Sequence, residues 1–145
     1  MSSFTLTRTI ARPYAETVDL VRSSLADQGF GVLTEIDFAA TLKEKLGVDL
    51  APEVILGACR PPLAYAAAQA EPSITAVLPC NVVVRWADHA TTVVEVIDPA
   101  AMMALAQPDG GNAALDAVAD EAGQRIAAVL DSLGTADPTG PWRPR

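Results

Sequence analysis

The sequence predicts an α+β domain with two layers, in which helices pack on one face of a mixed or antiparallel sheet. Two patterns predict it. Segments in which apolar and polar residues alternate, as in half-buried strands, take turns with segments that carry apolar residues at helical spacing. In addition, two β-branched segments, 81–86 and 91–97, are joined by a short connection, which is typical of a β-hairpin and provides an antiparallel pair.

Two strands are predicted in the N-terminal part of the chain, over residues 4–10 and 30–36. In both, apolar and polar residues alternate for much of the segment, so we expect one face of each strand to be buried. The residues expected on the buried faces are Phe4, Leu6 and Ile10 in the first strand and Phe30, Val32 and Ile36 in the second.

Two helices alternate with these strands. The first begins at Pro13 and ends at Gly29, in keeping with the preference for proline at helix starts and for glycine just beyond helix ends. The second, over residues 38–46, has Asp37 as its capping residue and Gly47 as its stop. Its apolar residues form one stripe, made of Phe38, Leu42 and Leu46.

The remaining elements lead to a long C-terminal helix, capped by Asn112 and stopped by Gly134. We expect a single domain over residues 1–134. Residues 135–145 hold three prolines and show no periodicity, which predicts a flexible tail. The other predicted elements are a buried strand at 54–56, an alanine-rich helix that runs to about residue 70, the two hairpin strands and a short helix at 100–106, for which Asp98 is the capping residue.

Charge and length exclude several classes of partner. The chain of 145 residues has 10 Lys and Arg against 18 Asp and Glu, a formal net charge of −8. Such an acidic chain repels nucleic acid and anionic lipid. The longest uncharged segment, 72–84, is too short to cross a bilayer, and the N-terminus lacks a basic region followed by an apolar one. We therefore expect a cytoplasmic protein with no membrane or nucleic-acid partner.

Simple counts also exclude several chemistries. One histidine, His89, and two cysteines are too few for a four-ligand structural zinc site, and no HExxH is present. A hydrolytic triad would need His89 as its base, and the chain has no GxSxG motif. The pair Gly29 and Gly31 begins like a dinucleotide fingerprint but continues as a strand without a third glycine. These counts exclude those sites but leave the identity of any cofactor unknown.

The candidate site lies around the two cysteines. Cys59 ends a predicted strand and Cys80 begins another, so an antiparallel arrangement would put both sulfur atoms at the same end of the sheet. They could then act as a redox pair or as ligands of a soft metal, with Met102 or Met103 as a thioether ligand for copper(I). The alternative is that the methionines fill the core. The candidate ligand-binding residues are Cys59, Arg60, Cys80 and Asn81, and the candidate metal ligands are Cys59, Cys80 and Met102.

Three functions are compatible with these residues. The first is a small binding or sensing module that uses the thiols for an unidentified small ligand. The second is an enzyme with Cys59 as nucleophile, since the start of the following helix lowers a thiol pKa, but the available bases are His89 and the carboxylates. The third is a structural or partner-binding domain, in which Cys59 is a small buried apolar residue. The residues favour the binding module over the enzyme.

A series of motifs resembles the prokaryotic family called domain of unknown function 302, over about residues 4–133. The resemblance implies a single α+β domain of a TATA-binding-protein-like type and no established reaction. This chain departs from the family pattern at Arg60, where asparagine is usual, and at Thr75, where glycine is usual. The matching segments are 35–37 (EID), 42–48 (LKEKLGV), 55–59 (ILGAC), 61–64 (PPLA), 71–72 (EP), 78–84 (LPCNVVV) and 98–102 (DPAAM).

One segment also predicts self-association. Residues 64–70 of the alanine-rich helix include few polar side chains, which favours a subunit interface over a solvent-facing helix. We therefore expect a homo-oligomer, with a homodimer as the simplest form.

Overall fold

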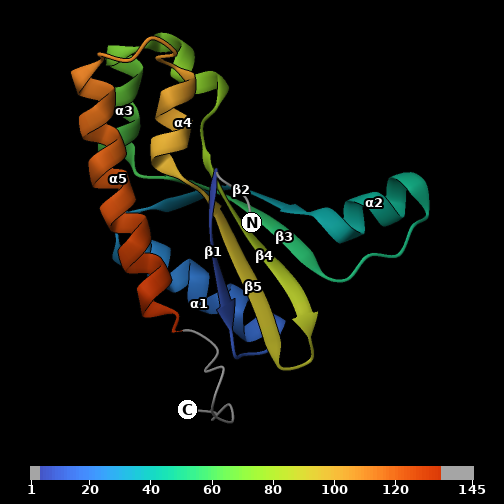
Figure 1. Ribbon diagram of the computed structural model, residues 1–145. Coiled ribbons are helices and arrows are strands. Elements are labelled where there is room, and N and C mark those ends of the chain that lie inside the picture. Colours follow the sequence, from blue (N-terminus) through green and yellow to red (C-terminus); the bar gives the residue numbers. More distant parts are fainter. Residues whose placement is uncertain (1–3, 135–145) are drawn as a thin grey trace.

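A five-stranded sheet organises the chain (Figure 1). The computed structural model describes residues 4–134, so the predicted tail over 135–145 lies outside the described residues. The strands follow the order β1-β5-β4-β3-β2, and every neighbouring pair is antiparallel. The strands are β1 (Thr5–Ile10), β2 (Gly31–Asp37), β3 (Glu53–Cys59), β4 (Cys80–Asp88) and β5 (Thr91–Ile97).

The helices occur in the predicted order, and their predicted caps are confirmed. Asp37, Asp98 and Asn112 each accept a hydrogen bond from a backbone N–H in the first turn of their helix. A short 3₁₀ helix that begins at Pro72 was not predicted. The helices are α1 (Tyr14–Asp27), α2 (Phe38–Leu46), α3 (Pro61–Ala70), η1 (Pro72–Ala76), α4 (Pro99–Leu105) and α5 (Ala113–Ser132).

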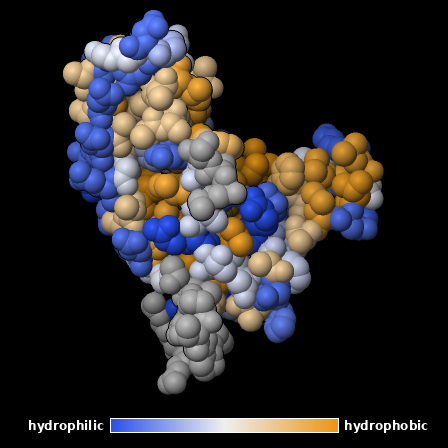
Figure 2. All heavy atoms as spheres, in the orientation of Figure 1, coloured by the Kyte–Doolittle hydropathy of each residue, from blue (hydrophilic) through white to orange (hydrophobic). Residues whose placement is uncertain are grey.

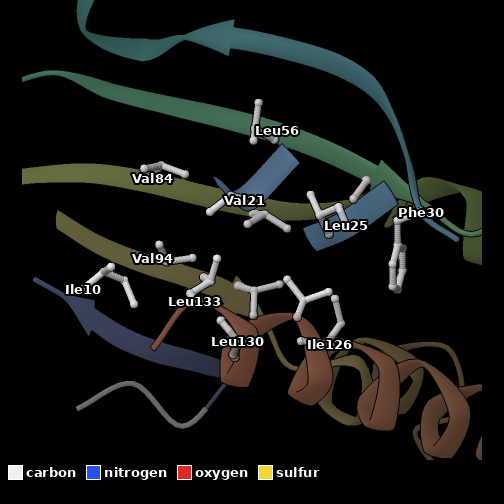
Figure 3. Close-up of a cluster of buried hydrophobic side chains, with 14 of the residues drawn as sticks. Ile10, Val21, Leu25, Phe30, Leu56, Val84, Val94, Ile126, Leu130 and Leu133 are labelled. Carbon is white, nitrogen blue, oxygen red and sulfur yellow. The ribbon is translucent and has the colours of Figure 1, made fainter. Parts of the chain in front are cut away.

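The main core lies between one face of the sheet and the helices α1 and α5. Val21 and Leu25 of α1 and Ile126 and Leu130 of α5 meet the inner side chains of the strands, among them Leu56 (Figure 3). These residues are almost completely buried. The prediction of an α+β domain with helices on one sheet face is therefore confirmed, and the sheet is antiparallel throughout.

A second apolar cluster continues the core beyond the end of the sheet, where β3 ends and β4 begins. In Figure 1, α3, α4 and part of α5 stand together at this end. The helices pack against one another here, and α5 contacts both α3 and α4. The buried members of this cluster are Ala67, Ile74, Cys80, Met102, Met103, Leu115 and Val118.

The edge strand β2 departs from the predicted pattern because it contains a bulge. Val32 pairs with Ala58, but Thr34 pairs with Gly57, so Leu33 is an extra residue. An extra residue reverses the alternation of faces. The prediction that Ile36 shares a buried side with Val32 is therefore wrong, and Ile36 is 45% exposed. Phe4, expected on the buried face of the first strand, precedes β1 and is also exposed.

The close approach of β2 to β3 at this bulge requires a glycine. A Cβ atom at Gly57 would lie 2.0 Å from the Thr34 Oγ1 atom and 2.8 Å from the Pro79 Cγ atom. Both distances are far below van der Waals contact, and Gly57 itself is buried. Gly57 thus lets β2 and the segment before β4 pack closely on β3.

Candidate functional site

The antiparallel pairing of β3 and β4 puts the two cysteines at the same end of the sheet, as expected. Cys59 is the last residue of β3, and Cys80, the first residue of β4, lies opposite Ala58. Both are free thiols. Cys80 is buried, whereas Cys59 is only partly buried.

A small cavity lies between this end of the sheet and the helices α3, α4 and α5. Both cysteines, Arg60 and Met102 contribute to its lining, and its volume is about 30 Å³. Cavities for organic ligands usually measure about 300–1,000 Å³, so this one has room for a single ion or one or two waters. The rest of the lining is apolar and includes Phe30, Leu63, Ala67, Leu78, Met103 and Val118.

Cys80 and Met102 bring two sulfur atoms together inside this cavity. The Cys80 Sγ atom lies 4.0 Å from the Met102 Sδ atom, at the distance of a weak S–H···S hydrogen bond. Met102 is 1% exposed and belongs to α4, which Asp98 caps directly after β5. The short connection from β5 to α4 therefore fixes the thioether next to the start of β4.

Burial keeps both thiols protonated. Burial raises the pKa of Cys59. Burial, with a smaller contribution from the nearby Cys59, raises the pKa of Cys80 to about 11. Both directions are opposite to the lowering that was expected for Cys59 from the start of the following helix, and the main cause is the loss of hydration on burial. Without a cation, the thiols are therefore poor nucleophiles at neutral pH.

Arg60 closes the side of the cavity and connects three helices. Its Nε atom donates to the Gln28 carbonyl oxygen (3.2 Å), and its Nη1 atom donates to the Glu121 Oε2 atom (3.0 Å). The Glu121 carboxylate also lies 3.5 Å from the Arg125 Nε atom. The charge of Arg60 is thus paired with a carboxylate of α5, and the residue joins the end of α1 and the start of α3 to α5.

The structure separates Asn81 from the other candidate residues. Asn81 follows Cys80 in the strand, so its side chain lies on the opposite face of the sheet. There it is exposed and lines a shallow groove with Phe4, Val83 and Glu95. The same alternation would turn Cys59 away from the face that Ala58 and Cys80 share, yet Cys59 ends β3 and still lines the cavity. Cys59, Arg60, Cys80 and Met102 share the cavity, whereas Asn81 is outside it.

Among the residues that line the cavity, within the described range 4–134, none is a histidine, an aspartate or a glutamate that could act as a base. His89 lies in the turn after β4, whereas Cys80 begins that nine-residue strand. At about 3.3 Å per residue, the strand separates them by roughly 25–30 Å. The nearest carboxylate described above, Glu121, is already paired with two arginines.

Sequence reasoning missed the apolar wall of the cavity. Leu63 and Ala67 are four residues apart on α3, and Val118 and Ala122 are four residues apart on α5. Their helical spacing indicates that each pair faces the same way. It does not indicate that both pairs face the same cavity, because that depends on how the helices pack.

Residues 4–134 lack two other features, a carboxylate- or histidine-rich metal cluster and a membrane span. No group of three or more His, Cys, Asp or Glu side chains is placed to hold a metal ion. No helix within this range combines the length and the apolar character that a bilayer span requires.

Comparison with known proteins identifies the family of this chain. A family model described as "Domain of unknown function DUF302" matches residues 6–133. The crystal structure of an uncharacterized conserved DUF302 protein from Bacillus stearothermophilus is similar, with 29% sequence identity and a TM-score of 0.78. The match covers 91% of this chain and 99% of that one. None of the curated proteins matches the chain.

Proposed function

This chain belongs to the DUF302 family, and we propose that it is a small binding module that holds one soft metal ion, copper(I), in its sulfur-lined cavity. The family carries no established activity, so the proposal rests on the cavity alone. The proposed ligands are the thiolates of Cys59 and Cys80 and the thioether of Met102. Thiolate and thioether sulfurs are the ligands that copper(I) prefers.

The distance between two of the sulfur atoms carries the proposal. In a trigonal site with metal–sulfur bonds of about 2.3 Å, the sulfur atoms lie about 4.0 Å from one another. The Cys80 Sγ and Met102 Sδ atoms are 4.0 Å apart. Both side chains are buried and held by regular secondary structure, so this pair is positioned for a metal before one binds.

The charges around the cavity support a monovalent cation. Binding releases one proton from each thiol that becomes a thiolate, so two thiolates and copper(I) leave one negative charge in the site. Arg60 lines the same cavity, and Arg60 and Arg125 share one carboxylate, Glu121, so the positive charge in excess there can offset the charge of the site. Since burial raises both thiol pKa values, binding is expected to strengthen as the pH rises.

Copper(I) and free thiols both need a reducing compartment. Cysteines remain thiols in the cytoplasm, which is therefore the location we propose. An enzyme with Cys59 as nucleophile is the weaker alternative, because the thiol pKa is raised and His89 lies at the far end of β4. The cavity also has no room for an organic substrate.

A copper(I) titration of the full, freshly reduced chain tests the proposal. Copper(I) is supplied without oxygen from a coloured chelator, and the complex is counted by native mass spectrometry. We expect one ion per chain and protection of both thiols from alkylation. Retention of no copper(I) against the chelator, or alkylation unchanged by copper(I), overturns the proposal.

Two methionine variants provide a matched comparison. Met102 and Met103 are neighbours in α4, both are buried, and both line the cavity. Met102→Leu removes the proposed ligand and is expected to weaken copper(I) binding by about tenfold or more. Met103→Leu keeps the three proposed ligands and is expected to bind as the wild type does. Equal affinities of the two variants would remove Met102 from the site.

A further inference from the structure

We propose that residues 31–50 form an arm through which two copies of this chain associate as a homodimer. The arm comprises β2, α2 and the connection that leads toward β3. In Figure 1, α2 projects away from the sheet and from the other helices. Among the described residues, its main contacts are with β2 and β3, the strands that flank it in the chain. This proposal is independent of the metal site.

Exposed apolar side chains are concentrated on this arm. Figure 2 shows them as an apolar surface over α2, away from the body of the molecule. Together they expose an area comparable to the largest apolar patches on monomers, about 300–600 Å², and such patches often mark interaction sites. The exposed large apolar residues of the arm are Leu33 (65%), Ile36 (45%), Leu46 (69%), Val48 (41%) and Leu50 (45%).

The described residues pack against the helix α2 only in part, through β2 and β3. The helix has nine residues, and none of its side chains is buried. Isolated helices shorter than about 12–15 residues are marginal in water, and most helices in proteins are stabilised by tertiary packing. Yet both ends of α2 are formed, with the Asp37 cap at its start and Gly47 in the left-handed conformation at its end.

The charge pattern of the arm identifies a second copy as the partner. Asp37 lies directly before the helix and Lys45 lies in its last turn, and neither is in an ion pair among the described residues. Glu35 and Lys43 are already paired within the chain, with Arg22 and Asp49. Two such helices packed antiparallel about a twofold axis would bring the basic end of each near the acidic end of the other. Opposite charges placed this way specify an orientation and a partner.

The apolar stripe fits the same antiparallel arrangement. Phe38, Leu42 and Leu46 repeat at four-residue spacing along α2. About a twofold axis, Leu42 would meet the partner's Leu42, while Phe38 would meet the partner's Leu46. Strand β2 next to the helix is an edge strand, so no neighbouring strand of its own sheet obstructs the approach.

The arm and the cavity lie at opposite ends of β3. Gly31, at the start of β2, pairs with Cys59, whereas Asp37, just before α2, pairs with Val54. A dimer formed through α2 therefore leaves the cavity uncovered. Dimerisation and copper(I) binding can succeed or fail separately.

The oligomeric state of the full chain tests the proposal, by sedimentation over a range of concentrations. We expect a mass twice that of the 15.1 kDa chain. Leu46→Glu is expected to weaken the dimer by about tenfold or more, because it would bury a charge in the interface. Leu105→Glu is the matched control, since Leu105 in α4 is 67% exposed and should leave the dimer unchanged.

Two single-cysteine variants test the geometry of the interface. In mildly oxidised protein, Leu42→Cys is expected to form a disulfide between the two copies. Ala40→Cys, on the other side of α2, is expected to form none. The proposal is overturned if the wild-type chain stays monomeric at every concentration, and the arm would then have a different partner. It is also overturned if Leu46→Glu leaves the dimer intact. Equal cross-linking of both cysteine variants also overturns it.

Discussion

The cavity end and the arm use the same kinds of residue with opposite results. At the cavity end, the apolar faces of α3, α4 and α5 converge, and residues such as Leu115 and Met102 are completely buried. On the arm, α2 carries an equally regular apolar stripe, but β2 and β3 cover it only in part: Phe38 and Leu42 are half-buried, and Leu46 is 69% exposed. Helical spacing therefore shows which side of a helix is apolar. Whether that side is covered within the chain depends on the neighbouring elements.

The largest expected difference between the two regions is in stability. Leu115→Ala in the buried cluster is expected to lower the free energy of unfolding by about 2–5 kcal/mol, because it leaves a cavity among packed side chains. Leu46→Ala on the arm is expected to change it by about 0.5 kcal/mol or less. Urea unfolding of dilute protein measures both values. Similar losses in the two variants would mean that α2 packs within its own chain.

Burial of the Cys80 thiol at the cavity end predicts that the free energy of unfolding depends on pH. The pKa of Cys80 is raised from 9.0 to about 11 in the folded chain, so its protonated form stabilises the fold. This stabilisation is complete below pH 9 and is lost as the pH rises through 11, a loss of about 2–3 kcal/mol. Urea unfolding between pH 8.5 and 11 measures it. Cys80→Ala should have a shallower pH dependence, and an unchanged one would contradict the burial of this thiol.

The junction between the arm and the sheet is expected to tolerate no side chain at Gly57. Gly57→Ala would place a Cβ atom against Thr34 and Pro79, and we expect a loss of about 1–3 kcal/mol in the free energy of unfolding. Adding Thr34→Ala removes the closest atom and should restore part of the stability, while the contact with Pro79 remains. Denaturant unfolding of the single and double variants tests this, and it fails if the second substitution restores nothing.

The smallest difference concerns two ion pairs. Arg60–Glu121 beside the cavity is partly buried, whereas Lys43–Asp49 on the arm is exposed on both sides. Double-mutant cycles with Arg60→Gln and Glu121→Gln should give a coupling of about 0.5–1 kcal/mol. The cycle with Lys43→Gln and Asp49→Asn should give a coupling close to zero. A larger coupling on the arm would reverse this order.

Local patterns predicted most of the fold. Asp37, Asp98 and Asn112 were recognisable as helix caps because capping involves residues close together in the chain. The hairpin of β4 and β5 was predictable for the same reason. The bulge at Leu33 was not, since it depends on the pairing of β2 with β3 and on the space above Gly57.

The candidate site was predicted in part. Cys59 and Cys80 were each placed at the end of a strand. If the two strands paired antiparallel, both thiols would lie at the same end of the sheet, and they do. The grouping of Asn81 with them ignored the alternation of faces along β4. The direction of the thiol pKa values could not be read from the nearby helix start, because it depends on burial by α3, α4 and α5.

The sequence by itself determined the order of the elements, their capped ends and the apolar side of each helix, because backbone preferences and side-chain spacing act within a few residues. Tertiary structure decided the rest. It brought Met102 to 4.0 Å from Cys80, paired Arg60 with Glu121 across 61 residues, and left α2 without a buried side chain. These features depend on which distant elements meet, and local sequence patterns carry no information on distances between elements.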